Sequence, residues 1–168
     1  SSTLSATAGD SYYWHTTTTT PSISATASGT YTVYVAHNAT NIIEVAAATI
    51  TVNPTPTVNT VTNQTVCNNT ATTAITFSGS VTGTTYSWTN NTTSIGLAAS
   101  GSGNIASFTG TNVTTAPVTA TISVTPTANG CVGASTSFTI TVNPTPTVST
   151  VTNQTVCNNT ATNAVTFS

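Results

Sequence analysis

Residues 52–78 of the chain read VNPTPTVNTVTNQTVCNNTATTAITFS, and residues 142–168 read VNPTPTVSTVTNQTVCNNTATNAVTFS. The two stretches are offset by 90 residues and differ at three of their 27 positions, namely 59/149, 73/163 and 75/165. Self-similarity at a fixed period is the signature of a repeat array. This period is too long for one turn of a solenoid, and it matches a small sandwich domain of about 100 residues. The stretch therefore predicts a tandem array of whole domains.

Two prolines mark each joint between repeats, in Pro54-Thr55-Pro56 and again in Pro144-Thr145-Pro146. Proline fixes φ and disfavours a helical residue before it, so each joint is predicted to be a short, stiff spacer. We expect residues 1–53 to be the C-terminal part of one domain, residues 54–143 a complete repeat, and residues 144–168 the first strands of the next repeat. The chain is thus expected to come from a longer protein.

Alternating apolar and polar residues predict strands along most of the chain. Phe138, Ile140 and Val142 alternate with threonines, and clusters of Gly, Asn, Pro and Ser separate such runs as turns do. Trp14 and Trp88 each follow a tyrosine two residues earlier and are predicted to be equivalent. A buried tryptophan on a central strand is typical of immunoglobulin-like cores. The predicted fold is all-β, with tandem immunoglobulin-like antiparallel β-sandwich repeats.

Charged side chains are almost absent from the chain. It has no Lys or Arg, two acids, Asp10 and Glu44, and two histidines, His15 and His37, and its net charge is −2. Nucleic-acid binding relies on Lys and Arg against phosphate, and so does attachment to anionic lipid through a basic patch. No apolar run approaches the roughly 20 residues of a membrane-spanning helix. We expect neither a nucleic-acid partner nor direct insertion into a membrane.

The same scarcity argues against catalysis and metal binding. Paired carboxylates for glycoside hydrolysis must lie about 5–10 Å apart, and only Asp10 and Glu44 are present. No nucleophile motif accompanies either histidine, and no ligand spacing predicts a zinc site. A calcium site would need backbone carbonyls for nearly all of its ligands. We therefore expect a protein that is not an enzyme, with no catalytic residues, no metal site and no cofactor.

Two motifs resemble a known class of repeat. One is Ser28-Gly29-Thr30-Tyr31-Thr32-Val33-Tyr34-Val35, followed by the strand end T-I-T-V-N-P-T-P at 49–56, and the other is Asn129-Gly130-Cys131 followed by a similar strand end. They resemble the PKD-like and Ig-like repeats of Bacteroidota surface proteins, although the W-D-F-G-D-G motif of true PKD domains is absent. The resemblance implies a giant gliding-motility adhesin of the SprB type, or a similar protein, exported by type IX secretion to the cell surface.

A mechanical or adhesive role follows as our expectation. The chain is predicted to be a stalk segment of a secreted, extracellular bacterial adhesin that serves gliding motility or surface attachment. The expected partners are neighbouring repeats of the same chain, with an extracellular polysaccharide or another surface ligand as a further candidate. The alternative is a set of non-catalytic accessory or carbohydrate-binding modules of a secreted polysaccharide-degrading enzyme. Lateral or end-to-end association into a filament stays open in either case.

Tyr13 and His15 are the candidate glycan contacts. They lie in a run of adjacent aromatic side chains with Tyr12 and Trp14. Because successive side chains of a strand point to opposite faces, Tyr12 and Trp14 are expected to face the core. Tyr13 and His15 would then point outward, where a sugar could stack on them. Plain strand packing, without any ligand, is the alternative reading of this run.

The three cysteines predict one disulfide within the complete repeat. Cys157 is the image of Cys67 one period later, so its own partner is expected downstream and the truncation leaves it unpaired. This leaves Cys67 to pair with Cys131, joining the end of the first strand to the turn before the last strand. Two buried thiols are the alternative. Such a bond implies an oxidising compartment and a stabilisation of roughly 4 kcal/mol from chain entropy.

Overall fold

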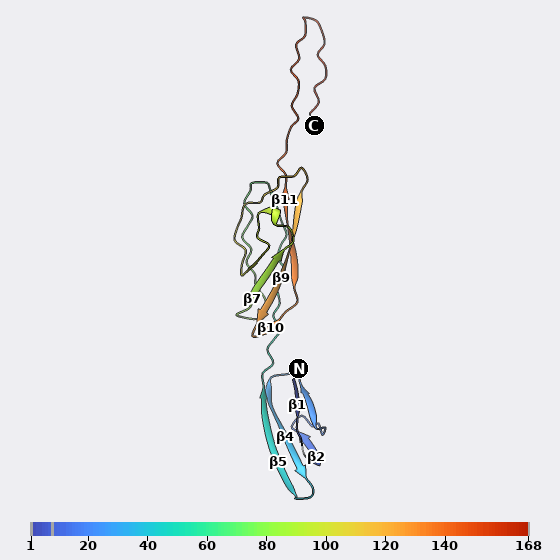
Figure 1. Cartoon of the computed structure of the whole chain (residues 1–168), viewed down its shortest axis with the longest axis vertical. Helices are drawn as coiled ribbons and strands as arrows, with labels where there is room; N and C mark the ends of the chain where they lie inside the picture. Colours follow the sequence, from blue (N-terminus) through green and yellow to red (C-terminus); the bar gives the residue numbers. More distant parts are fainter. Residues whose placement is uncertain (1, 8, 168) are drawn as a thin grey trace. The chain divides into compact units, whose positions relative to one another are not determined.

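The computed structural model describes residues 2–7 and 9–167, and nearly all of its regular structure is β-strand (Figure 1). Within these residues, eleven strands form three sheets, and Thr93–Ile95 forms one short 3₁₀ turn. The predicted all-β class is confirmed. The chain divides into two compact units. The first contains the residues up to Thr55 together with the turn Asn129–Cys131, and the second contains the remaining residues.

The first unit has a two-stranded and a three-stranded antiparallel sheet. In the smaller sheet, β1 (Ser2–Ser5) pairs with β3 (Ser22–Ala25). In the larger sheet, β2 (Ser11–Trp14), β4 (Gly29–His37) and β5 (Ile42–Ile50) lie in the order β2-β4-β5.

Alternation along β2 and β4 explains which side chains form the core of the first unit. Trp14, Val33 and Val35 are buried, and partly buried apolar residues of β1 and β3 pack against them. Tyr34, between the two valines, is exposed. Since successive side chains of a strand alternate between faces, one face of the larger sheet packs inward and the other faces solvent.

The second unit is built on one sheet in the order β6-β11-β9-β7-β8, with β10 paired to β9. The strands are β6 (Gln64–Cys67), β7 (Thr85–Asn90), β8 (Ser100–Ser102), β9 (Val118–Ala128), β10 (Cys131–Val132) and β11 (Thr136–Asn143). β6 is parallel to β11, whereas β11, β9, β7 and β8 are antiparallel neighbours. Asn129 and Gly130 join β9 to β10 with φ of 50° and 77°. These are the positive values that a type I′ hairpin turn requires.

The core of the second unit lies against one face of this sheet. Fully buried side chains alternate along β9 and β11, among them Ile122, Val124, Ile140 and Val142. Segments outside the named strands complete the same core. They are joined by isolated bridges from Ala71 to Thr109 and from Ile75 to Ile105.

Trp14 and Trp88 occupy equivalent positions in the two units. Trp14 on β2 is the register partner of Val33 on β4, and Trp88 on β7 is the register partner of Val124 on β9. Both tryptophans are buried, as are both valines. The predicted equivalence of the two tryptophans is confirmed, and β2 and β4 correspond to β7 and β9.

The same correspondence extends to the neighbouring strands. β5 pairs with β4 as β11 pairs with β9, and the sequence Ile-Thr-Val-Asn-Pro occurs at residues 50–54 and again at 140–144, so that Ile50 corresponds to Ile140. β1 pairs with β3 in the antiparallel sense, as residues 71–75 do with residues 105–109. β1 therefore takes the place in the first unit that residues 71–75 take in the second.

Residues 144–167 contain no strand in the structure, although their sequence repeats that of residues 54–77 (Figure 1). Beyond Pro144, every described side chain of this segment is exposed. The earlier copy is folded because it has β11 and residues 105–109 as partners. A strand or hairpin without such partners is at best marginally stable in water.

Candidate interaction surfaces

The outer edge of β5 is open. β5 pairs with β4 on one side, and no other strand of the described residues pairs with it. Every residue of β5 except Ile50 is exposed, including the large apolar side chains of Ile42, Ile43 and Val45. An edge strand presents unpaired backbone N–H and C=O groups, which makes it a template for another strand.

A groove beside this edge leads to the core of the first unit. Its volume is about 490 Å³, and its lining comprises Ser5, Ala6, Thr7, Val33, Val35, Glu44, Val45 and Ala46. Val33 and Val35 belong to the buried core cluster. The groove therefore offers apolar surface to whatever enters it.

In the second unit the equivalent surface is covered by that unit's own N-terminal segment. Pro56 is fully buried, and its carbonyl oxygen lies so close to Gly133 that a Cβ atom there would overlap it. The Asn59 N–H donates to the carbonyl oxygen of Ser78 at 2.8 Å. β6 then pairs with β11, the strand that corresponds to β5. Residues 56–67 thus cover this surface in the second unit.

The C-terminal segment carries a second copy of this cover. Its apolar side chains are exposed, among them Val148 (71%), Val156 (45%) and Phe167 (72%). The residues 90 positions earlier pack on the core of the second unit, namely Val58, Val66 and Phe77. The segment therefore exposes side chains that a folded repeat buries.

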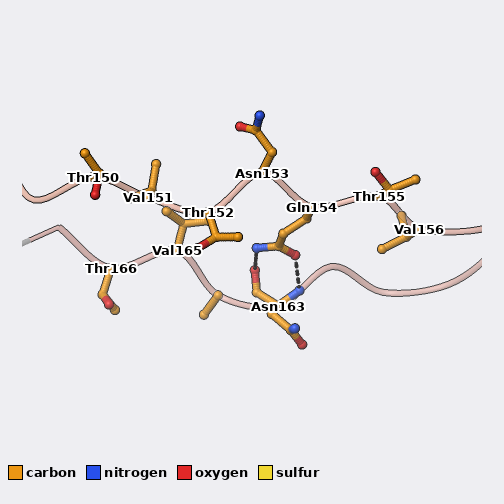
Figure 2. Close-up of a pocket in the computed structure, with 11 residues that line it drawn as sticks. Thr150, Val151, Thr152, Asn153, Gln154, Thr155, Val156, Asn163, Val165 and Thr166 are labelled. Carbon is orange, nitrogen blue, oxygen red and sulfur yellow. Dashed lines mark hydrogen bonds between the residues drawn. The ribbon is translucent and has the colours of Figure 1, made fainter.

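Gln154 joins the two facing parts of this segment, residues 150–156 and 163–166. Gln154 Nε2 donates to the carbonyl oxygen of Asn163 at 2.9 Å, and Gln154 Oε1 accepts from the Asn163 N–H at 2.7 Å (Figure 2). These two parts of the segment line an open groove of about 550 Å³. Gln64 makes the same two bonds to Thr73, each at 2.9 Å. The same glutamine contact thus occurs both in the folded repeat and in the exposed segment.

The two candidate glycan contacts lie on the outside of the first unit. Tyr13 is 49% exposed and stands beside Tyr34 of β4, with ring centroids 6.3 Å apart. His15 is exposed, its Nδ1 accepts from the Thr32 N–H at 3.2 Å, and its ring lies edge-on to Tyr31. Contact of Tyr13 and His15 with a sugar stays a prediction. Packing between neighbouring strands accounts for the contacts that these two side chains make with Tyr34, Tyr31 and Thr32.

The acids and the other histidine make local contacts in the first unit. Asp10 accepts a hydrogen bond from the Asn38 N–H at 2.6 Å, and His37 Nε2 lies 3.6 Å from the carboxylate of Glu44 across the β4–β5 hairpin. Among the described residues, no group of three or more His, Cys, Asp or Glu side chains gathers as metal ligands would. These contacts join neighbouring backbone segments.

The predicted disulfide between Cys67 and Cys131 is absent, and all three cysteines are free thiols. Because β6 is parallel to β11, Cys67 stands opposite Asn143 at the end of β11, whereas Cys131 precedes its first residue, Thr136. An eight-residue strand at about 3.3 Å per residue separates the two cysteines by more than about 20 Å. A disulfide requires Cα atoms within about 7 Å. The pairing assumed from the spacing is therefore corrected.

Cys131 lies instead beside the joint that precedes the repeat. Its Sγ is 3.8 Å from the carbonyl oxygen of Asn53, and Asn53 Nδ2 donates to the carbonyl oxygen of Asn129 at 2.9 Å. Sequence reasoning missed both this contact and the open edge of β5. The repeat carried a signal for the pairing of β11, because the sequence of β6, the strand that pairs with β11, recurs one period later at residues 154–157.

No protein-family model matches the chain, and no curated protein matches it. Among the described residues, no helix combines the length and apolar character that crossing a membrane requires.

Proposed function

We propose that the chain is a load-bearing structural segment of a secreted bacterial surface protein, built from tandem immunoglobulin-like β-sandwich repeats. The observation that carries this proposal is the parallel pairing of β6 with β11. These strands are the first and the last of the second unit. Tension applied through the two joints of the repeat therefore acts on this pair.

The joints enter and leave the second unit at opposite ends of β11. The entering joint is held by the buried Pro56 against Gly133, which precedes β11. The leaving joint begins at Asn143, the last residue of β11, where the Asn68 N–H donates to the Asn143 carbonyl oxygen at 2.8 Å. A repeat with this geometry can transmit force along its length.

The β6–β11 pair resists that force in shear. Ladder hydrogen bonds run across the strands, so pulling parallel strands past one another loads all of them together. Four register pairs join the strands, from Ile140↔Gln64 to Asn143↔Cys67. Asn63 Oδ1 adds a bond from the Thr139 N–H at 2.8 Å at the other end. These bonds must fail together before the repeat opens.

A surface almost free of charge suits such a segment outside the cell. Salt screens interactions between charges, so a neutral fold is indifferent to the ionic strength around it. The absence of Lys and Arg also removes the sites that trypsin-like proteases cut. Together with the resemblance to Bacteroidota surface repeats, these properties favour the stalk of an extracellular adhesin, in gliding motility or surface attachment, with a polysaccharide or another surface ligand bound elsewhere.

Single-molecule force spectroscopy tests the load-bearing role. The chain is pulled through its two ends, and Asn63→Ala is compared with Asn153→Ala, the same change one period later in the exposed segment. We expect the second unit to open in one step, at a force that Asn63→Ala lowers and Asn153→Ala leaves unchanged. Asn68→Pro, which removes the N–H bonded to Asn143, is expected to lower it further. A unit that yields gradually at low force, with no effect of either change, contradicts the proposal.

A further inference from the structure

Two exposed aromatic rings stand side by side on the outer face of the three-stranded sheet of the first unit. Tyr13 on β2 and Tyr34 on β4 are register partners, 49% and 43% exposed, with ring centroids 6.3 Å apart. Val45 of β5, 60% exposed, is the register partner of Tyr34 on its other side. We name these three side chains the tyrosine row. We propose that the tyrosine row is a binding site for an uncharged polysaccharide.

The second unit has the same face without the aromatic rings. Since the two buried tryptophans are equivalent, the tyrosine row corresponds to Ser87, Thr125 and Ser135. Ser87 and Ser135 are exposed, Thr125 is partly buried, and the Thr125 and Ser135 hydroxyl oxygens lie 2.7 Å apart. The face is therefore open in both units. Serine and threonine satisfy what the fold needs at these positions, so the two tyrosine rings are available for a partner.

The size of the tyrosine row favours a narrow partner. The row crosses three neighbouring strands, a length of about 15 Å at about 5 Å per strand, and it is one residue wide along each strand. A stable interface between two folded proteins buries about 800 Å² on each partner. The row covers only a small part of such an area, so a single polysaccharide chain fits it better than a folded partner or a second copy.

The row offers no charged group to a ligand. The chain contains no Lys or Arg, so phosphate groups and nucleic acids lack the cationic side chains that they require. The carboxylate of Asp10 accepts a backbone N–H at 2.6 Å. Glu44 precedes Val45 and therefore points to the opposite face, where it lines the groove of about 490 Å³. His15 lies beyond the row, and its Nδ1 accepts a backbone N–H at 3.2 Å.

The chemistry of the row suits a sugar chain. The C–H face of a pyranose ring packs on the face of an aromatic ring, and the two tyrosine rings can meet two successive sugars. Their planes are inclined by 44°, which suits a single twisted chain better than the flat surface of a crystal. Each tyrosine hydroxyl both donates and accepts hydrogen bonds, and Ser11 and Thr32 follow along β2 and β4 on the same face.

This site is additional to the ligand that a surface adhesin binds elsewhere, and it does not depend on the load-bearing role. The tyrosine row belongs to the first unit, whereas the β6–β11 pair belongs to the second. Force spectroscopy of the second unit and sugar binding by the first can therefore fail independently.

Equilibrium binding to insoluble polysaccharides tests the proposal. The whole chain is mixed with amorphous cellulose, xylan, mannan, curdlan or cross-linked dextran, and the protein left in the supernatant is measured. We expect saturable binding to at least one of these materials. Tyr13→Ser with Tyr34→Thr should reduce that binding at least tenfold. These are the residues that the second unit carries at the equivalent positions, so the first unit should keep its fold, which circular dichroism checks.

Ser87→Ala with Thr125→Ala is the matched control on the second unit, and it should leave binding unchanged. Binding should also persist in about 1 M salt, because salt screens only interactions between charges. Absence of binding to every polysaccharide, or equal binding by the tyrosine variant, overturns the proposal. Binding that salt abolishes excludes an uncharged ligand. Sedimentation velocity covers the remaining partner, because self-association that the tyrosine changes remove would identify a second copy as the occupant and overturn the assignment to a polysaccharide.

Discussion

Gln154 binds both the N–H and the carbonyl oxygen of Asn163, and it does so in a segment that has no strand and no buried side chain. The same side chain one period earlier, Gln64, makes the same pair of bonds to Thr73 inside a folded unit. The two sites differ in what surrounds them and hardly at all in sequence. They form a natural matched pair for measuring what this contact contributes.

Replacing Gln64 by Ala should destabilise the second unit by about 1–2 kcal/mol, because two hydrogen bonds with a modest net value are lost. Gln154→Ala should leave the midpoint of thermal unfolding unchanged in dilute solution, since its segment belongs to no core. Circular dichroism at a strand wavelength measures both. An equal loss in the two variants would show that the C-terminal segment contributes to the fold of the second unit.

Gly101→Ala should destabilise the second unit by about 1–3 kcal/mol through overpacking. Gly101 is the register partner of Trp88, and an added Cβ would overlap the indole ring. Denaturant unfolding followed by Trp88 fluorescence in a Trp14→Phe background measures the effect. Gly29→Ala is the control, because no atom lies within 4 Å of its Cβ position. A neutral Gly101→Ala would mean that the indole shifts at no cost.

Asn112→Ala should cost the second unit about 2–4 kcal/mol, because buried carbonyl groups lose their donor. Asn112 is buried, and its Nδ2 donates to the carbonyl oxygens of Ala116 and Val142, each at 2.8 Å. Urea unfolding of this variant is compared with that of Thr115→Ala, an exposed neighbour that should change little. Similar midpoints for both variants would contradict this role for Asn112.

The stability of the second unit should not depend on pH between about 3 and 7.5. Stability changes with pH only where folded and unfolded states bind different numbers of protons. The second unit contains no Asp, Glu or His, the side chains whose ordinary pKa lies within or near this range, and no Lys or Arg. Thermal unfolding monitored through Trp88 in the Trp14→Phe background tests this. A midpoint that moves between acid and neutral pH would reveal a dependence of the second unit on the first, which holds all four Asp, Glu and His residues.

Much of the fold could be predicted because the period-2 pattern reports directly on burial. Phe138, Ile140 and Val142 are buried as their alternation predicts, and Trp14 and Trp88 are equivalent as their flanking residues predict. The cysteine pairing could not be predicted, because spacing contains no strand direction. Had β6 paired with the same residues in the antiparallel sense, Cys67 would have stood opposite Ile140, nearer to Cys131. The parallel register places it at the far end instead.

The two copies of the repeated stretch separate what the sequence determines by itself from what the tertiary structure decides. The turn after the cysteine is the same in both: Asn69 and Asn159 have φ of 61° and 63°, and the Thr70 and Thr160 N–H groups each bond to the cysteine carbonyl oxygen at 3.1 Å. These contacts span a few residues, so ordering them costs little chain entropy, and side chains such as Asn tolerate the left-handed conformation.

Strand and core formation depend on the surroundings. Phe77 is 6% exposed and its copy Phe167 is 72% exposed. Residues 64–67 form strand β6 beside β11, whereas their copy, residues 154–157, forms no strand. A strand has no internal hydrogen bonds, so its backbone groups and apolar side chains need partners that are distant in sequence. The sequence of the repeat therefore determines the turns and the alternation by itself. Only the presence of a complementary edge decides whether that alternation becomes a buried strand.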